Sequence, residues 1–288
     1  MLLKQNECIL KDSGFLLLLQ LTSIICKNIS FGHIVILQFM LKGEILMGRL
    51  LIISLSFIAM TVFSIMANLM PLNGYTTSEI SNRYTVLFSP AGYVSVIKIF
   101  IYIILGLWVY LQWKKRQAQQ NITGVQTALF SFSALFNILW LYLWHYEYFT
   151  WSIIAILLMV LSLIGLYFTY PNWQNAWSGR IPISLFLAWE SIIAFMNIAF
   201  LFTHNHWNFL SLSDPLWTVI ALTVGTAAAL HLRYHHDDYV FPIVYIWTFI
   251  GIAFKNGFDE LLVSTAALFL SGVLLVGILL IKKTKPSE

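Results

Sequence analysis

The feature that most constrains the fold is a series of long apolar runs separated by short polar breaks. A bilayer core about 30 Å thick is crossed by a helix of about 20 apolar residues. Only 10% of the residues are charged, whereas soluble domains have about 25%, and the mean hydropathy is +0.81. The runs lack the residue-by-residue alternation of membrane β-strands. The sequence therefore predicts an all-α, polytopic membrane helix bundle.

The apolar runs from Arg49 onward predict about eight transmembrane helices. Both ends of the eight-helix unit then lie on the same side of the membrane. We expect the helices near residues 49–70, 91–112, 125–145, 150–169, 181–203, 215–232, 239–255 and 261–281.

Residues 1–46 differ from the rest of the chain. Their two apolar runs, of about 13 residues each, are broken by Lys27 and Asn28 and are short for a span. Both cysteines, Cys8 and Cys26, lie in this segment, so no disulfide framework connects the eight helices. Met47 directly precedes the first long span, and we hypothesise that translation begins there.

The basic residues are distributed unevenly between the two sides of the expected bundle. Only Arg83 and Lys255 fall on the side opposite Arg49. Cytoplasmic loops carry the excess of Lys and Arg, so we expect both ends of the eight-helix unit to lie in the cytoplasm. We expect the membrane to be the plasma membrane of a bacterium. The sequon at Asn121 would then stay unmodified. The residues on the Arg49 side are Lys114, Lys115, Arg116, Arg180, Arg233, Lys282, Lys283 and Lys285.

Polar and aromatic side chains recur along single faces of several expected helices. A Lys or Asp at the centre of a span costs about 2.5–3.5 kcal/mol, so such groups need a partner or a cavity. Residues three, four or seven positions apart share a helix face. We therefore predict a pocket with aromatic walls and a few polar groups among the first five helices. The candidate ligand-binding residues are Lys98 and Tyr102, Asn137 and Trp140, and Trp189, Glu190 and Asn197.

Structural explanations exist for the same residues. Asn and Ser often connect helices by hydrogen bonds, and a Trp near a span end often lies in the interfacial belt, as we expect for Trp108 and Trp151. Lys98 and Glu190 have two alternatives. They form an intramembrane ion pair, or Lys98 extends to the headgroups while Glu190 is protonated.

Three segments resemble the translocator protein / tryptophan-rich sensory protein (TspO/MBR) family: "LFSPAGYV", "LFNILWLYLW" and "LAWESIIAFMN". That family consists of five-helix membrane proteins that bind tetrapyrroles and other flat apolar ligands. Tyr102, the pair Asn137 and Trp140, and the pair Trp189 and Asn197 match its helix motifs. The polar first loop, Lys98 and Glu190 depart from the family pattern.

This resemblance divides the chain into three parts. Residues 1–46 form an extension, residues 47–203 form the five-helix bundle similar to the family, and residues 204–288 add three transmembrane helices and a basic tail. The whole chain from Met47 resembles a longer branch of the family. In the added helices, Ala221, Gly225 and Ala229 form a ridge suited to close packing.

Several function classes lack sequence support. The chain has no Gly-rich phosphate loop, no HExxH and no GxSxG, so we expect no catalytic residues and no enzyme activity. The loop "HLRYHHDDY" is better explained as a solvated turn than as a metal site. We expect no cofactor and no nucleic-acid partner. The expected partners are the lipid bilayer, a hydrophobic small molecule and a second copy in a homodimer.

Three hypotheses for function follow. The leading one is the binding, transport or sensing of a planar hydrophobic small molecule such as a tetrapyrrole, with Lys98 available to neutralise a ligand carboxylate. The second is a proton-coupled secondary transporter that uses Glu190. The third is a structural or partner-binding membrane protein without a ligand pocket.

Overall fold

The computed structural model describes residues 43–115, 122–171, 176–205 and 212–281. It divides into two units, Met1–Arg49 and Leu50–Glu288. Of the first unit only the beginning of a helix, from residue 43 onward, is described. Most of the N-terminal extension, the Asn121 sequon and the lysines of the C-terminal tail lie outside the described residues, so the predictions about them stay predictions.

The all-helical prediction is confirmed. Within the described ranges, seven helices are long and apolar enough to cross a membrane, and one apolar helix is shorter. The first long helix is Gly43–Leu69, and the second, Gly92–Lys115, combines the 3-10 turn η1 (Gly92–Val96) with α3 (Ile97–Lys115). The others are α4 (Gly124–His145), α5 (Phe149–Phe168), α6 (Arg180–His204), α7 (Asp214–His236), the shorter α8 (Val240–Asn256) and α9 (Leu261–Leu280).

Local sequence signals set several helix boundaries. Thr123 begins α4 through a reciprocal capping box with Gln126, which satisfies two backbone N–H groups that lack an intrahelical acceptor. Pro182 lies in the first turn of α6, where its missing N–H costs nothing. Gly257 ends α8 with a φ of 48°, a conformation that glycine adopts without a Cβ penalty. These signals explain why the predicted span limits are close to the observed ones.

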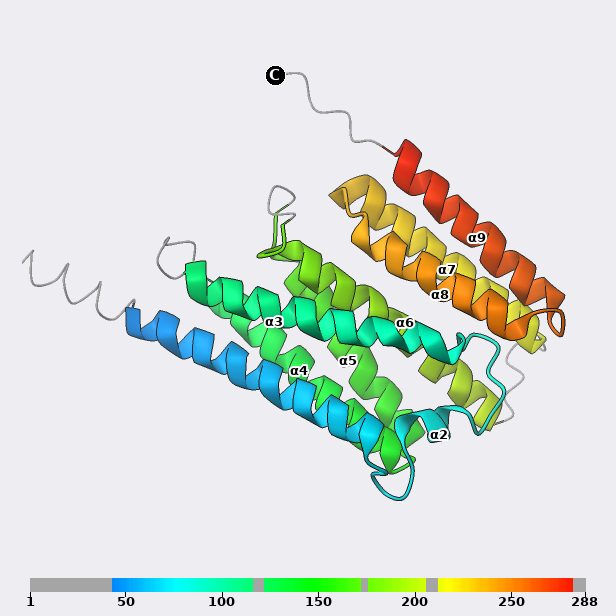
Figure 1. The fold of residues 1–288 in the computed structure, drawn as a ribbon, viewed down its shortest axis with the longest axis horizontal. Coiled ribbons are helices and arrows are strands. Elements are labelled where there is room, and N and C mark those ends of the chain that lie inside the picture. The colour runs from blue at the N-terminus through cyan, green and yellow to red at the C-terminus, as the bar shows by residue number, and fades with distance from the viewer. Residues whose placement is uncertain (1–42, 116–121, 172–175, 206–211, 282–288) are drawn as a thin grey trace, which may run out of the picture. The chain divides into compact units, whose positions relative to one another are not determined.

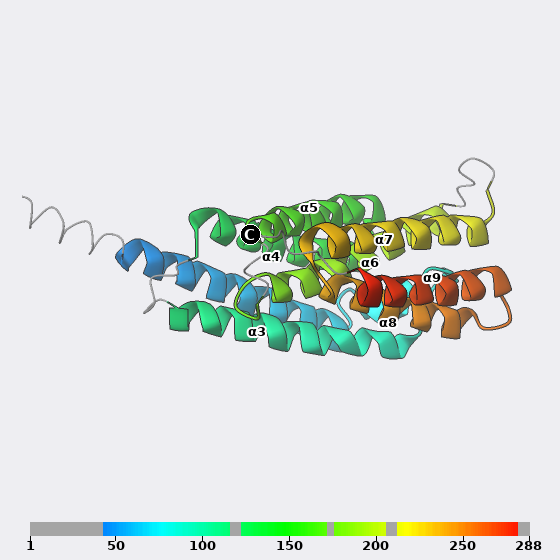
Figure 2. The ribbon, with the colours of Figure 1, turned by 90° about the horizontal axis from the view of Figure 1, so that it is seen from above.

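The helices of the second unit alternate in direction, and α6 is the most buried of the long ones. It packs against α3 and α5 among the first helices and against α8 among the last three. Figure 2 shows the last three helices, α7, α8 and α9, grouped together. The last three helices pack on one another, with α9 against both α7 and α8. A Cβ at Gly225 would lie 2.5 Å from Cε1 of Tyr245, so the predicted small-residue ridge of α7 does allow close packing.

The predicted interfacial position of Trp108 is wrong. Trp108 is not in an interfacial belt: it is 0% exposed and packs on Phe130, with ring centroids 5.0 Å apart. Its place near the end of the predicted span says nothing about which face of α3 it occupies, and that face is directed into the bundle. Trp151, in contrast, is 63% exposed near the beginning of α5, as an interfacial position requires.

Candidate functional site

A cavity with a volume of about 490 Å³ lies at the end of the bundle where α6 and α8 finish. Its walls come from the first helix, the short helix α2 (Thr77–Ser81), η1, α3, α4, α6 and α8. This volume is within the range of small-molecule sites, about 300–1,000 Å³. We call it the tryptophan cavity, and its walls include Trp140, Trp144, Trp189, Phe200, Asn68, Asn197, Lys98 and Lys255.

The first loop forms part of this cavity through α2. Thr76 caps α2, and the Glu79 carboxylate accepts hydrogen bonds from the Thr76 backbone N–H at 2.7 Å and from its hydroxyl at 2.9 Å. These hydrogen bonds lower the pKa of the exposed Glu79 carboxyl below its ordinary value. Thr77 anchors the helix by donating to the Ala67 carbonyl at 3.0 Å. The polar loop therefore places the hydroxyls of α2 at the cavity wall.

The predicted site residues line two adjoining spaces. Lys98, Trp140, Trp189 and Asn197 line the tryptophan cavity. A much smaller pocket, of about 10 Å³, shares three of these side chains, and a space of that size holds about one water molecule. The remaining predicted residues, Tyr102, Asn137 and Glu190, line this small pocket.

The side-chain amides of the predicted site residues Asn137 and Asn197 also connect helices. The Trp140 indole N–H donates to Asn197 Oδ1 at 3.2 Å, which connects α4 to α6. Ser64 donates to Asn137 Oδ1 at 3.1 Å, which connects the first helix to α4. Both amides are almost fully buried. Their contacts match the interhelical role that Asn often has in membranes, and they also fix the orientation of the cavity wall.

Lys98 and Glu190 face the small pocket together but form no direct ion pair. The Lys98 ammonium lies 5.8 Å from the centroid of the Trp189 ring, within the range of a cation–π contact. Lys98 is thus directed into the bundle rather than to the headgroups. Within the described part of the chain, Glu190 Oε2 and the Trp189 indole N–H have no hydrogen-bond partner.

Sequence reasoning missed Lys255, which lines the tryptophan cavity from the last turn of α8. The sequence did mark Lys255 as unusual, since it is one of only two basic residues expected on the side of the membrane opposite Arg49. Sequence alone does not place Lys255 on the same cavity as Lys98, 157 positions earlier, because its position depends on how α8 packs against the first loop. Trp144, which continues the face of Asn137 and Trp140, also lines the cavity.

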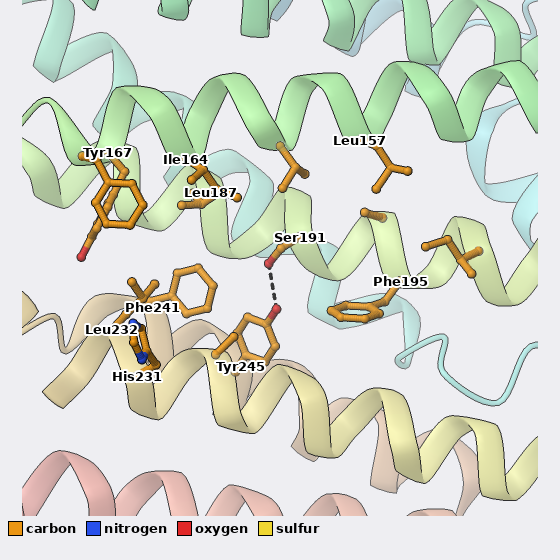
Figure 3. Close-up of a pocket in the computed structure, with 15 residues that line it drawn as sticks. Leu157, Ile164, Tyr167, Leu187, Ser191, Phe195, His231, Leu232, Phe241 and Tyr245 are labelled. Atoms are coloured by element: carbon orange, nitrogen blue, oxygen red, sulfur yellow. Dashed lines mark hydrogen bonds between the residues drawn. The ribbon is translucent and has the colours of Figure 1, made fainter. Parts of the chain in front are cut away.

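A second, apolar cavity of about 400 Å³ lies between α5, α6, α7 and α8 (Figure 3). Its central polar contact is a hydrogen bond of 2.8 Å between the hydroxyls of Ser191 and Tyr245, which connects α6 to α8. Since each hydroxyl has the other as partner, neither of these two groups needs a ligand. The remaining walls are mostly aliphatic and aromatic.

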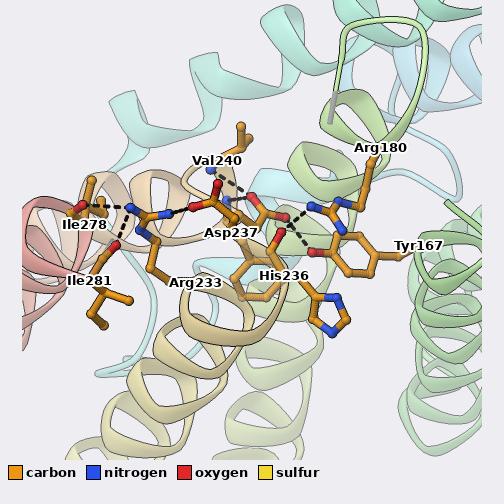
Figure 4. A network of polar contacts seen from close by, with 10 residues as sticks. Tyr167, Arg180, Arg233, His236, Asp237, Val240, Ile278 and Ile281 are labelled. Carbon is orange, nitrogen blue, oxygen red and sulfur yellow. Dashed lines mark hydrogen bonds and ion pairs between the residues drawn. The ribbon is translucent and has the colours of Figure 1, made fainter. Parts of the chain in front are cut away.

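The loop between α7 and α8 holds a network of polar contacts (Figure 4). Asp238 is buried and accepts hydrogen bonds from the hydroxyls of Tyr167 at 2.9 Å and Ser184 at 2.5 Å. Arg180 donates to the His236 carbonyl, and Arg233 pairs with Asp237. Among the described residues, no group of three His, Cys, Asp or Glu side chains is arranged to hold a metal ion. The expected solvated turn is wrong for Asp238, which is 1% exposed, and the loop connects helices through these hydrogen bonds.

A family model described as "TSPO-like protein" matches residues 50–280. The match continues beyond the first five helices through α7, α8 and α9. No curated protein and no solved structure matches the chain.

Proposed function

The chain belongs to the TSPO-like protein family, and we propose that it binds a planar hydrophobic small molecule, such as a tetrapyrrole, in the tryptophan cavity. The observation that carries this proposal is the cavity itself: about 490 Å³, with three indole rings and two lysines in its wall. Transport or sensing would follow from binding at this place. The proposal assigns ligand contact to four residues predicted from the sequence, Lys98, Trp140, Trp189 and Asn197, and to Trp144.

The wall chemistry suits a flat ligand with an acidic edge. The rings of Trp140, Trp144 and Trp189 offer stacking surface, and aromatic pairs contribute about 0.5–1.5 kcal/mol beyond the burial of area. Asn197 lies beside Trp140 and holds its indole by a hydrogen bond. Lys98 supplies a positive charge for a ligand carboxylate. A hydrogen bond between two ionised groups is stronger than one between neutral groups.

A titration tests this proposal. The detergent-purified protein is titrated with protoporphyrin and with haem while tryptophan fluorescence is followed. We expect saturable quenching that weakens about tenfold in Trp189→Phe and Asn197→Ala, because each loses about 1–2 kcal/mol of contact or orientation.

Trp151→Phe is the matched control, since Trp151 is exposed on α5 and does not line the cavity. It should leave the affinity unchanged. Quenching that never saturates, or that is the same in the wild type and in both cavity variants, would contradict ligand binding at this site.

A proton-coupled transporter is the second candidate, favoured by the buried Glu190 carboxylate. Its Oε2 has no hydrogen-bond partner within the described residues, and it faces a pocket large enough for about one water molecule beside Lys98. In vesicles with an imposed pH gradient, uptake of the ligand should then require the gradient and should stop in Glu190→Gln. Glu147→Gln, in the exposed pair with Arg83, is the matched control. Equal uptake with and without the gradient would reject coupling.

The remaining expectations extend this proposal. A bacterial plasma membrane, cytoplasmic ends, a homodimer and a non-enzymatic role are consistent with a ligand-binding protein of the bilayer. A structural protein without a ligand predicts that no porphyrin raises the melting temperature, because only a ligand that prefers the folded state does so.

A further inference from the structure

The second half of helix α8 is docked on η1 and on the segment that leads into it by three hydrogen bonds. The Trp247 indole N–H donates to the Val94 carbonyl at 3.3 Å, and the Ala91 N–H donates to the Gly251 carbonyl at 3.0 Å. Near the helix end, Asn256 donates to the Leu87 carbonyl at 2.9 Å. These contacts fix the last turn of α8 at the rim of the tryptophan cavity.

Lys255 is the residue before Asn256 and lines that cavity. The Lys255 ammonium has no ion pair or hydrogen bond with any described residue. The described residues of the cavity wall include Lys98 and Lys255 but no Asp or Glu. Two cations, one from α3 and one from α8, therefore share one aromatic cavity without an anion in its wall.

We infer that Lys255 is a second anion-recognising group of this cavity, and that the site selects planar hydrophobic ligands with two acidic groups over their neutral forms. This inference rests on the proposed function. It adds that the helices beyond the first five take part in ligand selection. Lys98 recognises one acidic group beside Trp189, and Lys255 recognises the other at the rim.

The test compares a diacid with its neutral ester at constant ring shape. Protoporphyrin and protoporphyrin dimethyl ester are titrated against the full-length protein in a neutral detergent, with tryptophan fluorescence as the readout. We expect the wild type to prefer the diacid by about tenfold or more. Lys255→Gln should weaken diacid binding about five- to tenfold and leave ester binding unchanged. Lys255→Arg should retain the preference.

Lys114→Gln, on an exposed lysine near the other end of the second long helix, is the matched control and should change neither affinity. Equal affinity of the wild type for diacid and ester would overturn this inference while leaving ligand binding in place. Loss of the preference in Lys98→Gln but not in Lys255→Gln would overturn the role of Lys255. Failure of the wild type to bind either porphyrin would overturn the proposed function and this inference with it.

Discussion

Asp238→Ala is expected to destabilise the protein by about 3–7 kcal/mol in all, mainly because two buried hydroxyls lose their acceptor at about 1–3 kcal/mol each. These are the hydroxyls of Tyr167 on α5 and Ser184 on α6. The second carboxylate oxygen accepts the backbone N–H groups of Val240 and Phe241, in the first turn of α8. Losing such a cap costs about 1 kcal/mol more. The melting temperature in detergent should fall accordingly.

Two variants separate this explanation from a general effect of removing an acid. Asp214→Ala removes an exposed aspartate from the first turn of α7 and should shift the melting temperature little. Asp238→Asn keeps an acceptor oxygen of similar shape and should recover part of the stability. If Asp238→Ala has the same melting temperature as Asp214→Ala, the network of Figure 4 does not stabilise the packing of α5, α6 and α8.

The sequence predicted the membrane spans well, because their length and apolar content follow directly from the thickness of the bilayer. It also selected residues that line the cavity: the helical spacing of Asn137 and Trp140, and of Glu190 and Asn197, places each pair on one face. The family match over residues 50–280 confirms the resemblance that those motifs suggested.

The sequence did not predict how the faces meet. Trp108 is close to the end of its predicted span, yet its face of α3 packs on Phe130. Lys98 and Glu190 face the same pocket, but they do not form the direct pair that complementary charge suggested. Lys255 reaches the cavity only because α8 docks on the first loop. Such contacts are set by the packing of helices far apart in sequence, which periodicity does not encode.

Gly251 permits the close approach of α8 to η1. A Cβ at this position would lie 2.2 Å from Cγ2 of Val94 and 3.3 Å from Cβ of Pro90. Val94 is fully buried, and its branched side chain has little rotamer freedom to move away. Gly251→Leu should therefore cost about 3 kcal/mol or more through overpacking, seen as a lower melting temperature.

The same substitution should also weaken ligand binding, because separating α8 from η1 moves one wall of the tryptophan cavity. Gly272→Leu is the matched control: this helical glycine of α9 has no atom within 4 Å of its Cβ position. There leucine should be neutral or stabilising by up to about 1 kcal/mol, since it is a better helix former than glycine. Equal melting temperatures for the two variants would show that α8 does not depend on this contact. Lower stability of Gly251→Leu with unchanged porphyrin affinity would show that the cavity forms without docked α8.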